Sequence, residues 1–163
     1  PVTTDSTKKI YTWTQANGTK ASTTGTIYGI YDMSGGAWER TASLVNNGNG
    51  NLTTYGKSLM NSLINGKSSQ YVTVYSVSAS SDSGQNNWSE NTKIGDAIYE
   101  ISTGVENKES WYKDYFSFPF KDRPFCARGG FLSDSERAGL FYFDCNNGGC
   151  TYVVGFRSIL VAL

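Results

Sequence analysis

Glycine and small polar residues divide this sequence into short apolar runs. Glycine, serine, threonine and asparagine supply 67 of the 163 residues, and these residue types favour turns and loops over helix interiors. Between them lie short runs rich in β-branched and aromatic residues, of which 71–77 and 139–143 are the clearest and are typical of strands. The sequence therefore predicts many short strands joined by long loops, with one or two helices.

The segments around these strands predict a helix, two loops and a bend. Residues 52–64 place apolar side chains near one helical face, although Gly56 lies inside the run. The polar stretch 79–91 predicts a surface loop, and 144–149 predicts another. Residues 126–131 indicate a strand that ends in a glycine bend. Short strands combined with few helices are typical of an α+β fold with irregular loops.

The length of the chain limits the number of domains. A chain of 163 residues forms no more than one ordinary domain and can bury about two-thirds of the surface that its unfolded form exposes. We therefore expect residues 1–163 to form a single domain. Because the chain opens with Pro1 and not with methionine or a targeting pattern, we also expect it to be a fragment or processed form of a longer chain.

Charge and the absence of histidine exclude several classes of function. The 14 lysines and arginines balance the 14 acidic residues, so a neutral chain has no electrostatic attraction for nucleic acid or an anionic membrane. With no histidine, the chain cannot hold a Ser-His-Asp or Cys-His catalytic group or a histidine-ligated metal. No apolar run approaches the ~18 residues of a membrane span. We expect no nucleic-acid partner and no membrane contact by this domain.

Three cysteines, at positions 126, 145 and 150, leave three interpretations open. They are structural thiols, a loop disulfide between Cys145 and Cys150, or a reactive thiol, for which Arg128 is a nearby cation in sequence. A cysteine metal site lacks further ligands. The acidic residues are scattered and contain no EF-hand loop, so an irregular Ca²⁺ site in a loop stays an alternative and no cofactor is predicted.

Three motifs follow one another in a characteristic order. They are Gly29-Ile-Tyr-Asp-Met-Ser-Gly-Gly-Ala-Trp-Glu39, Arg128-Gly-Gly130 and Gly155-Phe-Arg157. Over residues 27–161 the chain resembles the formylglycine-generating-enzyme, or sulfatase-modifying-factor, branch of the C-type lectin fold. The resemblance implies short twisted antiparallel strands, one or two helices and long irregular loops.

The motif residues and one further tryptophan carry structural expectations. Trp38 is expected to anchor the core, and Arg157 to pair with Glu39 or Asp32. Trp111 is also expected in the core, with a sugar-stacking platform as the alternative.

The catalytic activity of that branch is not expected here. Its catalytic members carry two cysteines well upstream of Gly-Phe-Arg, just before an Ala-Ala-Arg-like segment. The corresponding stretch of this chain, 134–137, contains no cysteine, and Cys145 and Cys150 lie later. We therefore expect a protein that is not an enzyme, with a cysteine-dependent oxidase as the least favoured alternative.

The chain more closely resembles the non-catalytic variable proteins of diversity-generating retroelements. These display a hypervariable C-terminal segment that is diversified at adenines, and here the segment corresponds to 126–157. All residues of 144–154 belong to the set encoded by triplets that end in C, which fits this origin. The resemblance implies display outside the cell, on the cell surface or on a phage particle, with a pilin-like or anchor segment upstream. The expected partner is an extracellular protein or glycan, and a structural pilus or phage-tail subunit is the alternative.

Under this resemblance the binding face consists of side chains that project outward from 131–153 and contribute little to the core. Tyrosine and arginine would supply most of the binding energy. The candidate ligand-binding residues are Phe131, Leu132, Arg137, Tyr142, Asp144, Cys145, Asn147, Thr151, Tyr152 and Val153.

Overall fold

The computed structural model describes residues 14–16, 18–22, 24–28, 36–91, 95–102 and 108–156. Several expectations lie outside these residues, namely the pairing of Arg157, most of the first motif and the end of the third. The side chain of Leu132 also lies outside them.

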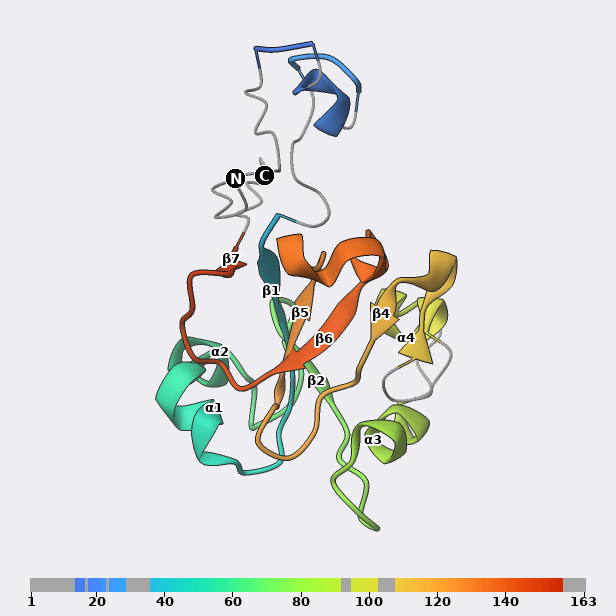
Figure 1. Cartoon of the computed structure of the whole chain (residues 1–163). Helices are drawn as coiled ribbons and strands as arrows, with labels where there is room; N and C mark the ends of the chain where they lie inside the picture. The colour runs from blue at the N-terminus through green and yellow to red at the C-terminus, as the bar shows by residue number, and fades with distance from the viewer. Residues whose placement is uncertain are drawn as a thin grey trace.

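Within the described residues, seven strands form one mixed sheet, in the order β2-β1-β5-β6-β4-β3 with β7 also paired to β1 (Figure 1). The strands are β1 (Trp38–Val45), β2 (Thr73–Tyr75), β3 (Lys108–Glu109), β4 (Tyr115–Phe116), β5 (Phe125–Arg128), β6 (Phe143–Asn146) and β7 (Val154–Gly155). The central pairs β1–β5 and β5–β6 are antiparallel, as is β3–β4. The pairs β1–β2, β1–β7 and β4–β6 are parallel, so the expectation of antiparallel strands is wrong for half of the sheet's pairings.

Four short α-helices and three 3-10 helices accompany the sheet, so the α+β class is confirmed, but the expectation of one or two helices is wrong. They are η1 (Thr19–Ala21), α1 (Gly50–Tyr55), α2 (Lys57–Asn61), α3 (Gly84–Glu90), α4 (Ala97–Ile101), η2 (Trp111–Lys113) and η3 (Leu132–Arg137). Figure 1 places α1 and α2 to the left of the sheet and α3 and α4 to its right. These elements are counted in the described part of the chain.

The expected helix over 52–64 is present but divided at Gly56 into α1 and α2. A Cβ atom on Gly56 would lie 2.6 Å from the ring of Phe125, so no larger residue fits there without movement. The side chain of Asn49 caps α1 by accepting a hydrogen bond from the backbone N–H of Asn51. The glycine that interrupts the sequence pattern thus lets α1 pack closely against β5.

The expected loop over 79–91 is wrong, because residues 84–90 form α3. Ser83 caps this helix by accepting from the N–H of Asn86. Asn87 is fully buried, and its side chain accepts from Ser78 N at 2.8 Å and donates to Pro119 O at 2.9 Å. The polar residues that indicate a loop in the sequence therefore fasten a helix to two neighbouring segments.

The strand expected over 71–77 is present as β2 but covers only Thr73–Tyr75, and the last part of the chain differs from expectation. Residues 139–142 form a turn, in which Tyr142 N donates to Gly139 O, and only Phe143 of the expected strand 139–143 is extended. The following strand β6 occupies the first part of the expected loop 144–149.

Adjacent residues of β1 bury opposite faces of the sheet. Val45 packs with Tyr75, Phe116 and Phe143 in one cluster, whereas Leu44 belongs to another. Successive side chains of a strand point to opposite faces, so the middle of the sheet is covered on both sides. The second cluster consists of Leu44, Leu52, Val72 and Phe125.

Candidate ligand-binding surface

A glycine bend turns the chain from β5 into η3, as the sequence predicts. Gly129 and Gly130 have φ values of 86° and 69°, in the left-handed region that favours glycine. A Cβ atom on Gly130 would lie 2.7 Å from the Cβ of Ala138. The bend therefore needs glycine both for its backbone angles and for the close approach of the chain that returns from η3.

Asp134 fastens η3 to the beginning of β1. Its Oδ2 accepts hydrogen bonds from Trp38 Nε1 at 2.9 Å and from the backbone N–H of Phe131 at 2.8 Å. The rings of Trp38 and Phe131 pack edge to face with centroids 4.7 Å apart. Trp38 is half-buried and thus anchors the candidate segment more than it fills the core.

Two buried side chains from outside the candidate segment hold the turn over 139–142. Asp114 Oδ2 accepts from the backbone N–H of Phe141 at 2.8 Å, and Ser110 Oγ donates to Phe141 O at 2.6 Å. The Asp114 carboxylate also fills the space where a side chain on Gly139 would begin. The turn is therefore fixed through the backbone of Phe141 and by the lack of a side chain at position 139.

Arg40 on β1 holds the loop that follows β6. Its Nη1 donates to Asn146 Oδ1 at 3.0 Å and its Nη2 donates to Gly149 O at 2.6 Å. Asn146 Oδ1 also accepts from Gly148 N at 2.7 Å. One guanidinium thus ties the end of β6 to the loop three residues further on.

The last described strand, β7, returns to the start of β1. The backbone N–H of Trp38 donates to Val153 O at 2.8 Å, and Trp38 pairs in register with Val154. The neighbouring Glu39 forms an ion pair with Arg128 on β5 at 3.1 Å. The first residues of β1 therefore contact both ends of the candidate segment, near Phe131 and near Val153.

The structure divides the ten candidate residues by exposure. Arg137, Asn147, Thr151 and Tyr152 are exposed, and Tyr152 is fully so. Phe131, Asp144 and Val153 are half-buried. Tyr142 and Cys145 are buried, so the expectation that all ten face outward is wrong for these two.

Both exceptions have a local cause. The ring of Tyr142 lies against that of Tyr115 with centroids 5.5 Å apart, and its hydroxyl donates to Asp144 Oδ2 at 3.4 Å. Cys145 alternates with Asp144 along β6, and its thiol lies 3.4 Å from the hydroxyl of Ser117, whose backbone N–H donates to Phe143 O on the same strand. Cys145 is buried because of its phase in β6, which a prediction of loop at this position does not provide. Tyr142 precedes β6 and is buried through its contact with Tyr115.

The exposed candidates do not form one continuous patch. Tyr142 precedes β6 and Asn147 follows it, so η3 and the loop after β6 lie at opposite ends of that strand (Figure 1). Phe131 and Val153 come together through Trp38. The candidate surface is therefore a rim that runs from η3 to β7, with Asn147 set apart from it.

An exposed aromatic group lies beside this rim, where a sugar-stacking platform was only the alternative expectation. Trp111 and Tyr112 are 56% and 83% exposed and pack against Phe141, with ring centroids 5.6 Å and 5.5 Å away. Leu140 is also exposed. The expectation that Trp111 is a core residue is wrong. The exposure of this group could have been predicted from the three consecutive large side chains at 111–113, which cannot all point inward.

Burial raises the pKa of several ionisable groups near β6. The pKa of Cys126 is raised to about 12 and that of Cys145 to about 11, in both cases mainly by burial. Both thiols are therefore protonated at neutral pH, unlike a nucleophilic thiol. Burial also raises the pKa of the Asp144 carboxyl, against the opposing effects of the hydrogen bond from the backbone N–H of Cys145 and of the Arg123 charge. The structure has all three cysteines as free thiols, with Cys150 exposed.

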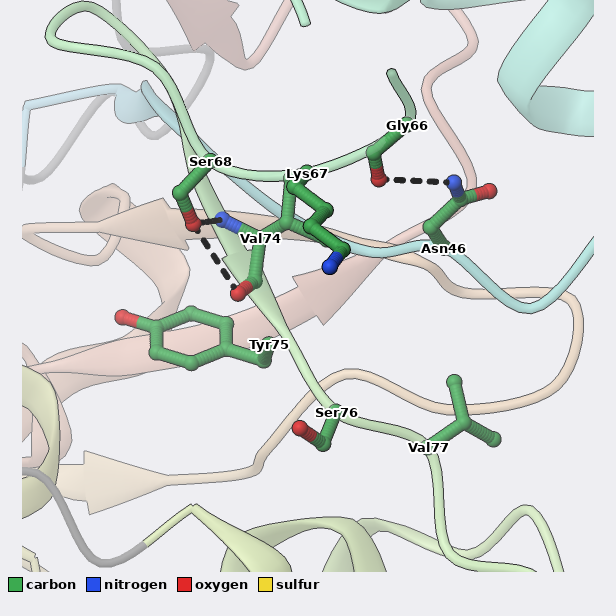
Figure 2. Close-up of a pocket in the computed structure, with 8 residues that line it drawn as sticks. All are labelled: Asn46, Gly66, Lys67, Ser68, Val74, Tyr75, Ser76 and Val77. Carbon is green, nitrogen blue, oxygen red and sulfur yellow. Dashed lines mark hydrogen bonds between the residues drawn. The ribbon is translucent and has the colours of Figure 1, made fainter. Parts of the chain in front are cut away.

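A groove of about 570 Å³ lies along β2, and Figure 2 shows its lining. Ser68 Oγ accepts from Val74 N at 2.8 Å and donates to Val74 O at 3.3 Å, and Asn46 Nδ2 donates to Gly66 O at 3.3 Å. These side chains thus satisfy backbone groups along the edge of the sheet. β1 and β5 separate this groove from β6, and it contains none of the ten candidate residues.

Carboxylates do not gather into a metal site in the part of the chain that the structure describes. There, no three acidic or cysteine side chains lie close enough together to hold a metal ion. Asp82 and Asp122 line a shallow hollow with Asn47, but the two oxygens of Asp82 already accept amide protons from Asn47 and Asn87. The Ca²⁺ alternative therefore has no assigned ligand set. Among the same residues, no helix has the length and apolar character to cross a membrane.

Comparison of the chain with protein families, curated proteins and solved structures finds no match.

Proposed function

We propose that this domain is a surface-displayed binding module with a C-type lectin fold, whose segment 126–157 recognises an extracellular ligand. The ligand is a protein more readily than a glycan, because the exposed side chains include Tyr152 and Arg137, types that dominate protein interfaces. The module is a variable protein of a diversity-generating retroelement, and its exposed side chains are the exchangeable ones.

One observation carries this proposal, namely that the framework holds the candidate segment largely by its backbone. Asp114 and Ser110 bind the N–H and the carbonyl of Phe141, and Arg40 binds the carbonyl of Gly149. Trp38 N donates to Val153 O. A residue keeps the same backbone N–H and C=O groups whichever side chain it carries, so these bonds persist when exposed side chains are exchanged.

The proposal assigns the candidate residues to two groups. Arg137, Asn147, Thr151 and Tyr152 are exposed and can contact a ligand, although Asn147 Oδ1 also accepts from Gly149 N at 2.9 Å. Tyr142 and Cys145 are buried and belong to the framework. A diversified segment of this kind would vary at the first group and stay constant at the second.

A second candidate function is a structural subunit that self-associates. It is favoured by the exposed apolar group of Trp111, Tyr112 and Leu140, since large exposed apolar patches mark contact surfaces. Light scattering of the full chain over a range of concentrations separates this function from a monomeric binding module.

Two experiments test the binding module. Sequencing of this locus in many cells of one strain is expected to find substitutions between Arg128 and Gly155, concentrated at codons of exposed residues. An array of extracellular proteins and glycans, probed with the full chain, is expected to give signals that R137A/N147A/T151A/Y152A loses while its Tm is retained. An invariant locus together with array signals that the variant keeps would contradict the proposal.

A further inference from the structure

Two of the three thiols face each other across the centre of the sheet. Cys126 on β5 and Cys145 on β6 are direct partners in the antiparallel register. They are 1% and 5% exposed, respectively. Cys126 packs in the same cluster as Phe143, which precedes Cys145 by two residues and therefore points to the same face of the sheet.

The register gives this pair the backbone geometry of a disulfide. Gly129 N donates to Tyr142 O, and pairs along an antiparallel ladder alternate between hydrogen-bonded and non-hydrogen-bonded. Gly129 and Tyr142 are thus a hydrogen-bonded pair. Because the pair type alternates and Cys126–Cys145 lies three pairs further along the register, Cys126 and Cys145 are a non-hydrogen-bonded pair. Such pairs have Cα atoms about 4.5 Å apart, within the range of about 4.4–6.8 Å that disulfides span.

The alternative link, between Cys145 and Cys150, fits the structure less well. Cys145 is buried on β6, whereas Cys150 is exposed in the following loop. Arg40 holds Asn146 and Gly149 between them, so its two bonds restrain the chain that a link between the two sulfurs would have to move. The pair across the strands needs rotation of two side chains and no change in strand pairing.

We propose that Cys126 and Cys145 form a cross-strand disulfide when the chain folds in an oxidising compartment. Each thiol loses one hydrogen, an S–S bond forms, and the two electrons and two protons pass to a disulfide oxidant such as oxidised glutathione or a thiol–disulfide oxidoreductase, which is reduced to two thiols. The inference goes beyond the proposed function and shares with it only the extracellular compartment.

Burial explains when the bond forms and why it lasts. Exchange proceeds through a thiolate, and the raised pKa of both buried thiols keeps thiolate scarce once the sheet is closed. The disulfide therefore forms while the strands pair, before the core excludes the oxidant. Once formed, it is shielded from reductants by the same burial.

Peptide mapping of the full chain tests the link directly. The chain is refolded in a buffer of reduced and oxidised glutathione, alkylated under denaturing conditions and digested without reduction. Trypsin cleaves after Arg128 and Arg137, which separates Cys126 from the peptide that holds both Cys145 and Cys150. The expected product is a linked pair of peptides with Cys150 alkylated.

Thermal unfolding supplies an independent measurement. The oxidised chain is expected to have a Tm about 5–15 °C above that of the chain with reductant, because the link closes a loop of roughly 20 residues. C150S is expected to keep this difference. C145S, whose hydroxyl can bond Ser117 in place of the thiol, and C126A are expected to lose it.

Three outcomes would overturn the proposal: alkylation of all three cysteines, a link confined to the peptide with Cys145 and Cys150, or a redox-dependent Tm that persists in C145S. Because the measurement reports a covalent bond, none of these outcomes depends on whether the segment binds a ligand.

Discussion

The carboxylate of Asp114 accepts a hydrogen bond from the backbone N–H of Phe141 at 2.8 Å and so joins the end of η2 to the turn before β6. Ser110 completes this connection by donating to Phe141 O, and both framework side chains are buried. A turn that carries exposed Leu140 is thus positioned by residues that lie outside the candidate segment. The stability of the turn should depend on Asp114 and not on Leu140.

Replacing Asp114 with alanine is expected to lower the free energy of unfolding by about 1–3 kcal/mol, because it leaves the N–H of Phe141 without its buried partner. Urea denaturation measures this loss. D114N keeps an oxygen acceptor of the same shape and should lose less. A D114A variant as stable as L140A would contradict the role assigned to this carboxylate.

Adding a methyl group at position 139 is expected to destabilise the fold by about 1–3 kcal/mol, since the Asp114 carboxylate occupies that space. The matched control is Gly50→Ala in α1, where a Cβ atom meets nothing within 4 Å. Alanine there should be neutral or slightly stabilising. Equal unfolding free energies for G139A and G50A would argue against the close approach of Asp114 to Gly139.

The sequence predicted the elements whose formation depends on residues close together in the chain. The β-branched run at β2 and the strand with its glycine bend at β5 are visible in the sequence because propensity and φ requirements act over few residues. The helical run broken at Gly56 was visible for the same reason, although only the structure shows that Phe125 requires a glycine there.

Long-range polar contacts account for the elements that were missed. The sequence of α3 has the polar composition of a loop. Asn87 in this helix is nevertheless buried, because it bonds Ser78, which precedes the helix, and Pro119, which is distant in sequence. β6 contains Asp144 and Asn146, which disfavour strands, and it is extended because β5 and β4 pair with it. No local pattern reports such partners.

The same reasoning applies to the candidate binding residues. Exposure of Asn147, Thr151 and Tyr152 follows from polar and turn-forming neighbours. Burial of Cys145 follows from the phase of β6, which the sequence did not predict. Burial of Tyr142 follows from the turn before β6 and the contact of its ring with Tyr115, a long-range partner.

Exchange of exposed candidates should change stability far less than exchange of buried ones. The combined variant R137A/N147A/T151A/Y152A is expected to shift Tm by no more than about 4 °C, because exposed side chains contribute little to the core. Y142A is expected to lose about 3 kcal/mol through the cavity it leaves, as measured by urea denaturation.

Tyr142→Phe serves as the control for this comparison. It keeps the ring contact with Tyr115 and removes only the hydroxyl that donates to Asp144. Its loss should be well below that of Y142A. A combined surface variant that unfolds as readily as Y142A would mean that the exposed residues belong to the framework.

Arg40 should govern the order of the loop after β6. R40A removes the bonds to Asn146 and Gly149 and is expected to cost about 1–3 kcal/mol, with faster amide hydrogen exchange at Gly148. R40K should restore little, since an ammonium cannot reproduce the fork that reaches both acceptors. Unchanged exchange at Gly148 in R40A would show that the loop is held by other contacts.

Stability should also respond to pH through Asp144. Burial raises the pKa of its folded-state carboxyl above the unfolded value, which lies near ~3.9. The folded chain then binds this proton more readily than the unfolded chain, so the stability that the group contributes is full below the unfolded pKa. That contribution is lost as pH rises through the raised folded pKa.

The variant D144N cannot titrate at this position and isolates the effect. Relative to the parent chain, it should gain stability as the pH is raised from about 4 to 7, as measured by urea denaturation at each pH. D122N removes one negative charge from an exposed site and corrects for the change in net charge. A difference between D144N and the parent chain that stays constant with pH, or that favours the parent as pH rises, would mean that the carboxyl of Asp144 is not penalised by its burial.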